Sequence, residues 1–118
     1  MEIKFYQTTR GDYPVLEFIK NLPENHRKKI LDKIDRLRRY GLQNSVCIGI
    51  VKKIKGKKYK GLYELIVNYD KNFYRIFFNI IRDNCWLIHV IKKKSNTTPP
   101  QALDKTINIK KQLENKYQ

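Results

Sequence analysis

The sequence has little that would indicate a disulfide framework, a metal centre or a membrane segment. Its 118 residues include only two cysteines. Cys47 and Cys85 lack the CxxC spacing of metal and redox sites, and their apolar neighbours predict buried free thiols. No apolar run approaches the roughly 18 residues that would span a bilayer, and the N-terminal segment lacks the apolar stretch of a signal peptide. We therefore expect a cytoplasmic protein without a membrane segment.

Motifs of the common cofactor-dependent enzymes are missing as well. The chain has no GxxxxGKS/T, GxGxxG or HExxH motif, so phosphate-loop, dinucleotide and zinc-protease chemistry lack support. Its two histidines, His26 and His89, have no metal-ligand spacing. We expect neither a cofactor nor a metal.

Acidic residues are scarce, because 11 Asp and Glu stand against 26 Lys and Arg and give a formal net charge of +15. A field of this size attracts polyanions, and phosphate backbones are the commonest of these. Hydrophobic residues make up 41% of the chain, with eight Tyr, five Phe and one Trp, so the composition is that of a folded domain. The length suits a single domain over residues 1–118. Charge alone can also serve solubility, so it indicates nucleic acid without identifying a reaction.

Hydrophobic spacing predicts the order strand, helix pair, strands, helix. The predicted elements are a strand at 3–6, helices at 12–22 and 24–40, strands at 46–55, 62–69, 73–81 and 85–93, and a C-terminal helix. Asp12 can cap the first helix, and Gly41 ends the second. Compact turns between the last three strands favour an antiparallel meander. The sequence thus predicts an α/β (α+β) fold in which the helices cover one face of the sheet.

Alternation along the strands separates the two faces of this sheet. The face expected to meet the helices carries Tyr74, Ile76, Phe78, Ile80, Trp86, Ile88 and Val90. The opposite, open face is expected to carry Glu64, Arg75, Leu87, His89 and Lys93. This assignment assumes that the strands have no bulge, because one extra residue moves every later side chain to the other face.

The side chains of the open face suit the cleavage of RNA without a metal. Such cleavage needs a base for the ribose 2′-hydroxyl, cations for the phosphorane-like transition state and an acid for the leaving oxygen. Arg75 presents forked donors to phosphate oxygens, Lys93 adds a point charge or a proton, and His89 transfers protons near neutral pH. The alternatives are a structural role for His89 and an ion pair between Arg75 and Glu64.

A second basic cluster precedes the central strands. It comprises Lys52, Lys53, Lys55, Lys57, Lys58, Tyr59 and Lys60. We interpret it as a loop that follows an RNA backbone, with Tyr59 stacking on a base and Lys92 adding a further contact. The alternative is a solvated edge strand whose lysines prevent aggregation.

Several short motifs carry a resemblance to a known family. They are GLYELI at 61–66, Tyr74-Arg75-Ile76, Leu87-Ile88-His89, Lys92-Lys93-Lys94 and Thr98-Pro99. Their order and spacing resemble the phage-derived HigB branch of the RelE toxin superfamily over nearly the whole chain. Two positions depart from its pattern, since Ile66 stands where an arginine is usual and Val90-Ile91 replaces a Gly-Phe pair.

The resemblance implies a compact RelE-like fold and a toxin of a type II toxin–antitoxin system. Such a toxin is an mRNA interferase, a ribosome-dependent endoribonuclease that inhibits translation and is neutralised by a cognate helix-turn-helix antitoxin. Operator DNA would be bound only through the antitoxin complex. The resemblance places Arg75 on the phosphate and makes Lys93 and Lys94 the basic motif of the site. A noncatalytic ribosome- or RNA-binding module, or a DNA-binding repressor, is the alternative class.

Overall fold

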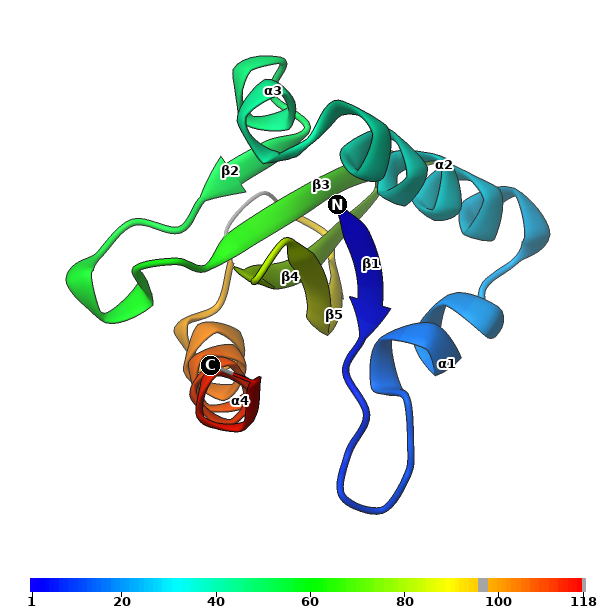
Figure 1. Cartoon of the computed structure of the whole chain (residues 1–118). Helices are drawn as coiled ribbons and strands as arrows, with labels where there is room; N and C mark the ends of the chain where they lie inside the picture. Colours follow the sequence, from blue (N-terminus) through cyan, green and yellow to red (C-terminus); the bar gives the residue numbers. More distant parts are fainter. Residues whose placement is uncertain (96–97, 118) are drawn as a thin grey trace.

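The computed structural model, which describes residues 1–95 and 98–117, has one five-stranded sheet with helices packed against it (Figure 1). The strand order is β1-β5-β4-β3-β2, with β1 parallel to β5 and the other neighbours antiparallel. The elements are β1 (Glu2–Phe5), α1 (Pro14–Lys20), α2 (Glu24–Tyr40), α3 (Leu42–Cys47), β2 (Val51–Lys53), the 3-10 helix η1 (Lys57–Tyr59), β3 (Tyr63–Tyr69), β4 (Asn72–Ile81), β5 (Asn84–Lys93) and α4 (Pro100–Tyr117). The predicted α+β fold and its antiparallel meander are confirmed.

The two turns of the meander have the tight geometry expected from the sequence. In each turn, both central residues have positive φ: 51° and 62° at Asp70 and Lys71, and 49° and 66° at Arg82 and Asp83. This is the backbone of a type I′ hairpin turn, whose twist matches that of the flanking strands. The turns therefore fix the register of β3, β4 and β5.

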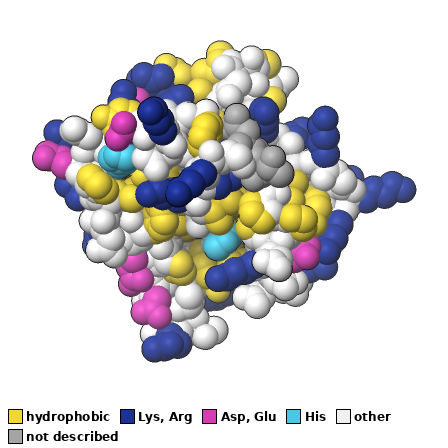
Figure 2. Space-filling view, turned by 180° about the vertical axis from the view of Figure 1, so that it is seen from behind, with side chains coloured by type: hydrophobic (Ala, Val, Ile, Leu, Met, Phe, Trp, Pro, Cys, Tyr) yellow, Lys and Arg dark blue, Asp and Glu magenta, His cyan; other side chains and the backbone are white. Residues whose placement is uncertain are grey.

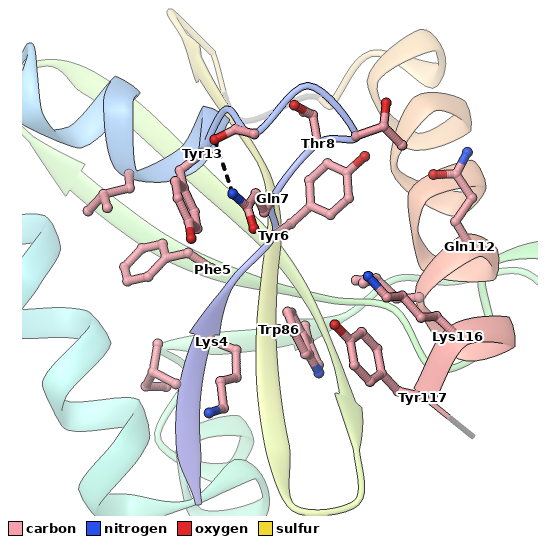
Figure 3. Close-up of a pocket in the computed structure, with 15 residues that line it drawn as sticks. Lys4, Phe5, Tyr6, Gln7, Thr8, Tyr13, Trp86, Gln112, Lys116 and Tyr117 are labelled. Carbon is pink, nitrogen blue, oxygen red and sulfur yellow. Dashed lines mark hydrogen bonds between the residues drawn. The ribbon is translucent and has the colours of Figure 1, made fainter.

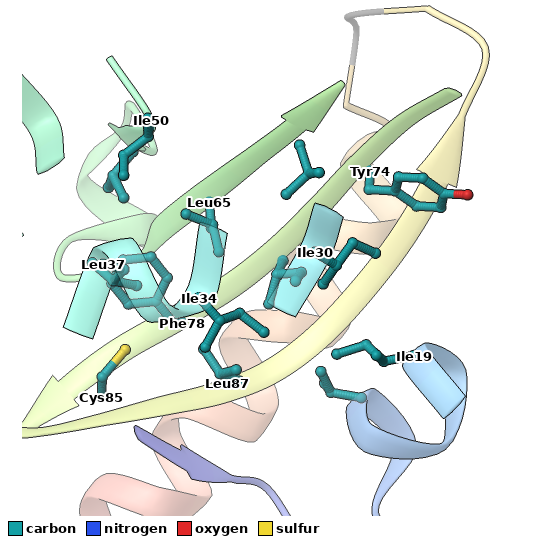
Figure 4. Packing of buried hydrophobic residues seen from close by; sticks show 14 residues of the cluster. Ile19, Ile30, Ile34, Leu37, Ile50, Leu65, Tyr74, Phe78, Cys85 and Leu87 are labelled. Atoms are coloured by element: carbon teal, nitrogen blue, oxygen red, sulfur yellow. The ribbon is translucent and has the colours of Figure 1, made fainter. Parts of the chain in front are cut away.

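The main core lies between the sheet and the helix pair (Figure 4). From the helices it takes Val15, Ile19, Ile30, Ile34 and Leu37, and from the strands Leu65, Val67, Tyr74, Ile76, Phe78, Cys85 and Leu87. The apolar stripe of α2 thus lies where its spacing predicts. Each fully buried side chain of this kind contributes roughly 1.5–3 kcal/mol relative to an exposed one.

The C-terminal helix packs on the sheet as expected, but on the face opposite to the helix pair rather than on the same face. Leu113 of α4 belongs to a second apolar cluster with Leu62, Phe77, Ile81 and Ile88. These strand residues alternate with the main-core set, so both faces of the central strands carry apolar side chains. A sheet that is apolar on both faces needs a helix on each.

A β-bulge explains why part of the predicted face assignment is wrong. Phe77 pairs with His89, and Phe78 pairs with Leu87, so Ile88 is an extra residue in β5. Trp86 and Ile88 therefore lie on the α4 face, and Leu87 lies in the main core. The predicted faces hold for the residues of β5 from His89 onward.

Three local predictions are also wrong. The segment expected as a strand from residue 46 begins as α3 and turns at Gly49, which has a φ of 84°, so β2 spans only Val51–Lys53. Cys47 is consequently exposed at the end of α3, whereas Cys85 is buried as expected. Asp12 does not cap α1: its carbonyl oxygen accepts a hydrogen bond from the Thr8 N–H at 2.8 Å, which closes the preceding loop.

Among the described residues, no helix is long and apolar enough to cross a membrane.

Candidate functional site

Arg75 is held rigidly at the centre of the α4 face of the sheet. The residue is only 3% exposed. Its Nη1 donates to Asn68 Oδ1 at 2.8 Å and to the carbonyl oxygen of Tyr74 at 2.9 Å, and its Nε lies 3.9 Å from Glu64 Oε1. Burial lowers the pKa of Arg75 and the Glu64 carboxylate opposes this effect, but a guanidinium stays protonated in proteins. Arg75 therefore supplies a fixed positive charge.

Lys93 lies on the same face as Arg75, at the end of β5. Its register partner on β4 is Phe73, two residues from Arg75, and its Nζ donates to Thr98 Oγ1 at 2.8 Å. Burial, then Arg75, and then Lys52 lower the pKa of Lys93, against the opposing effect of Glu64. Lys93 is thus a cation whose proton is easier to lose than that of an ordinary lysine.

His89 lies on β5, like Lys93, but on the opposite side of the position that pairs with Arg75. Its ring stacks on Phe77 with the centroids 6.1 Å apart. Arg75 pairs with Ile91, midway between His89 and Lys93, so each lies about 7 Å from the level of Arg75 along the strand. Burial and then Lys105 of α4 lower the pKa of His89. A phosphate above Arg75 would therefore have a neutral imidazole on one side and an ammonium on the other.

The face that carries these groups is less open than the sequence suggests, because α4 covers part of it. Arg75 and Glu64 are almost completely buried, whereas Lys52 is exposed and Lys93 and His89 are half-buried. In the view of Figure 2, Lys and Arg side chains lie among hydrophobic side chains across this face, and acidic side chains lie mostly toward the edge of the molecule. A polyanion would reach the lysines first and the guanidinium last.

The other residues of the predicted basic motif do not share this face. Lys92 pairs with Tyr74, whose side chain belongs to the main core, so it lies on the face opposite to Lys93. Lys94 follows the last residue of β5 and is exposed. Lys92 is one position closer to Arg75 in the strand register than Lys93 is, but its side chain lies on the other face of the sheet.

The predicted basic loop is divided between the two faces and the edge. Lys52 pairs with Glu64 and faces the site, whereas Lys53 pairs with Tyr63 and faces the other way. The remaining lysines are all exposed: Lys55, Lys57, Lys58 and Lys60. Of the predicted RNA-contacting lysines, Lys52 is therefore the one beside Arg75 and Lys93.

Tyr59 is tied to α4 rather than extended toward solvent. Its hydroxyl lies 3.1 Å from Asp104 Oδ1, and Lys58 Nζ lies 2.7 Å from the same oxygen. The hydrogen bond to Asp104 raises the pKa of Lys58 and, in turn, lowers the pKa of Asp104. The Tyr59 ring packs on the second apolar cluster. Base stacking on Tyr59 would require this loop to move.

Two neighbours of the site are not singled out by sequence reasoning. Asn68 holds the Arg75 guanidinium, and strand parity places it on the correct face without indicating the hydrogen bond. Lys105, which depresses the pKa of His89, comes from a helix whose position on the sheet has no signal in the sequence. Within the described residues, no group of three or more His, Cys, Asp or Glu side chains could hold a metal ion.

Comparison with known proteins identifies one family. Residues 17–111 match the family described as Phage derived protein Gp49-like (DUF891). Neither the curated proteins nor the solved structures give a significant match. The matched segment extends from α1 into α4 and contains every residue of the site described above. The chain therefore belongs to the phage-derived Gp49-like family, which is associated with toxin–antitoxin systems.

Proposed function

We propose that this protein is the toxin of a type II toxin–antitoxin system and that it cleaves RNA through the ribose 2′-hydroxyl. The observation that carries the proposal is the position of the fixed Arg75 guanidinium between His89 and Lys93 on one sheet face. A cation flanked by two proton-transferring groups is what metal-independent cleavage of a phosphodiester requires. The association of the Gp49-like family with toxin–antitoxin systems supports the same conclusion.

The pKa directions assign a role to each group. Burial lowers the pKa of His89, so the imidazole is neutral near neutral pH and accepts the proton of the 2′-hydroxyl. The 2′-oxygen then attacks phosphorus, while Arg75 and Lys52 stabilise the negative charge of the phosphorane. The lowered pKa of Lys93 makes its ammonium a better acid, which protonates the leaving 5′-oxygen. The products are a 2′,3′-cyclic phosphate and a 5′-hydroxyl.

The proposal extends to the partners of a HigB-like toxin. The net charge of +15 favours encounter with a dense polyanion such as the ribosome, where the protein would cleave mRNA during translation. We further propose that Lys94 assists Lys93, and that Lys92 and the lysines of the β2–η1 loop bind the RNA backbone. A cognate antitoxin would neutralise the toxin and bring it to operator DNA.

The test is induction of the protein in a bacterium without the antitoxin, followed by growth measurement and mapping of transcript ends. We expect growth arrest and new 5′-hydroxyl ends within coding regions. Arg75→Ala should abolish both effects. Arg39→Ala is the matched control, because Arg39 is an exposed arginine that pairs with Asp35 at 2.8 Å on α2, and it should behave as the wild type.

The competing function is a noncatalytic ribosome- or RNA-binding module. It is favoured by Ile66, which pairs with Arg75 in the sheet and contributes no cation to the site. This function predicts growth arrest with intact transcripts, or RNA binding that falls with salt and is never followed by cleavage. Normal growth with intact transcripts would contradict the toxin, and an absence of salt-sensitive RNA binding would contradict the binding module.

A further inference from the structure

A second polar and aromatic surface lies at the end of β5 opposite to Lys93. It is a groove of about 800 Å³ between β1, the loop that follows β1, and the C-terminal end of α4. Trp86 on β5 lines this groove, and its register partner Asn79 is four positions along β4 from Arg75, which is about 13 Å of strand. Arg75, His89 and Lys93 are not among the residues that line the groove. The groove is therefore distinct from the site around Arg75.

Aromatic rings form a wall of this groove (Figure 3). Trp86 and Tyr117 are stacked, with their centroids 4.9 Å apart and an angle of 25° between the rings. Tyr6 faces them from the β1 side of the hollow (Figure 3). Tyr117 is 39% exposed, so the outer member of this stack reaches solvent. Exposed aromatic faces of this kind bind nucleobases with little sequence preference.

The charged side chains of the groove are all positive. Lys116 Nζ lies 5.3 Å from the centroid of the Tyr117 ring, and Lys4 lines the opposite side. Lys4 is paired with the exposed carboxylate of Glu2 at 3.3 Å, but no Asp or Glu is among the described residues that line the groove. Cations next to a stacking platform suit a ligand that carries phosphates beside flat rings.

We propose that this groove binds single-stranded RNA, with a base stacked on Tyr117 and the adjoining phosphates beside Lys116 and Lys4. The inference rests on the proposed function, because it gives the RNA substrate a second contact outside the catalytic site. An acidic protein segment would use the lysines but not the stacked rings, so the aromatic wall favours RNA. The groove would set how firmly RNA is held, and the site around Arg75 would set whether it is cut.

The position of Trp86 allows a direct measurement, because it is the only tryptophan of the chain. The probe is a single-stranded 2′-O-methyl oligoadenylate of roughly ten nucleotides, within the usual range for single-strand sites. Its blocked 2′-oxygen prevents cleavage during the titration. We expect saturable quenching of the Trp86 fluorescence, which weakens as salt is added.

Substitutions at Tyr117 test the stacking. Tyr117→Ala should weaken binding by roughly 5- to 150-fold, the effect of removing one stacking ring, whereas Tyr117→Phe should restore it. Lys116→Ala should weaken binding and reduce its salt dependence. Tyr40→Ala is the matched control, since Tyr40 is an exposed tyrosine at the end of α2, and it should leave the affinity unchanged. Circular dichroism spectra and melting curves check that each variant is folded.

Four results would overturn the inference. They are no quenching by the oligonucleotide, equal affinity in Tyr117→Ala, equal quenching by inorganic polyphosphate, and quenching by oligoglutamate alone. Arg75→Ala separates this inference from the proposed function, because it should lose cleavage and keep the quenching. A wild-type protein that cleaves RNA without quenching would refute the groove alone, and one that quenches without cleaving would refute the nuclease alone.

Discussion

Arg75→Ala should destabilise the protein as well as inactivate it. Arg75 is 3% exposed; its guanidinium donates to Asn68 and to the Tyr74 carbonyl oxygen, and it lies 3.9 Å from the Glu64 carboxylate. In the variant, Glu64 would remain as a carboxylate that is 8% exposed and whose Oε2 already lacks a partner among the described residues. Removing one partner of a buried ion pair typically costs about 3–5 kcal/mol. Because this pair is long, we expect a loss of about 2–4 kcal/mol.

The loss of unfolding free energy should be smaller when the unpaired charge of Glu64 is removed as well. In Glu64→Gln/Arg75→Ala, the neutral amide needs no cation, so about 1–2 kcal/mol of the loss should return. Urea unfolding of the wild type, both single variants and the double variant, followed by circular dichroism, gives the coupling energy by linear extrapolation. Activity should remain absent in the more stable double variant, because the phosphate has lost its guanidinium.

Three results would contradict this role of Arg75. A loss below about 1 kcal/mol in Arg75→Ala would show that Arg75 does not compensate the buried carboxylate. A double variant no more stable than Arg75→Ala would show the same. A double variant that regains RNA cleavage would show that the single variant was inactive through misfolding.

Three further predictions concern other groups of the chain. Burial and nearby cations, Lys52 among them, lower the pKa of Lys93 below the ordinary 10.5. If Lys93 is the acid, the cleavage rate should therefore fall as the pH rises, and the fall should begin below pH 10.5. Lys52→Ala should raise this pKa and shift the alkaline limb of the pH profile of kcat/KM to higher pH. An alkaline limb at the same pH would exclude Lys93 as the acid. Burial raises the pKa of Cys85 to about 12 while Cys47 is exposed, so mass spectrometry should find one alkylated cysteine in the folded protein and two after unfolding; equal labelling of both when folded would contradict this burial. Asn79 is 1% exposed and neither amide atom has a partner within the described chain, so Asn79→Leu should raise the unfolding free energy in urea by about 1–2 kcal/mol, and a decrease would show that the amide is bonded.

The elements of the fold follow from local patterns in the sequence. The stripe of Ile30, Ile34 and Leu37 gives α2 its length and its buried face. The meander follows from the alternation of apolar residues along the strands and from the two short turn segments that separate β3, β4 and β5. The short helix α3 is missed because Val46 and its neighbours are apolar enough to resemble a strand, and the deciding turn at Gly49 has no strong local signal.

Part of the site was predictable from the alternation of side chains along the strands. Parity alone brings Arg75, Lys93, His89 and Glu64 to one face, because they lie on the same side of the bulge or on neighbouring strands. The depth at which Arg75 is buried, and the influence of Lys105 on His89, depend on where α4 lies. Tertiary packing sets that position, and periodicity does not report it.

The extra residue in β5 adds a side chain to one face of this strand. Ile88 and His89 are consecutive residues that face the same side, one packed against α4 and the other beside Arg75. Deleting Ile88 would restore an uninterrupted ladder, in which Leu87 still faces the main core and His89 and Lys93 still face α4. The bulge therefore places one more apolar side chain under α4 without changing the face of any other residue of β5, so loss of Ile88 should lower stability and leave the site on the same face.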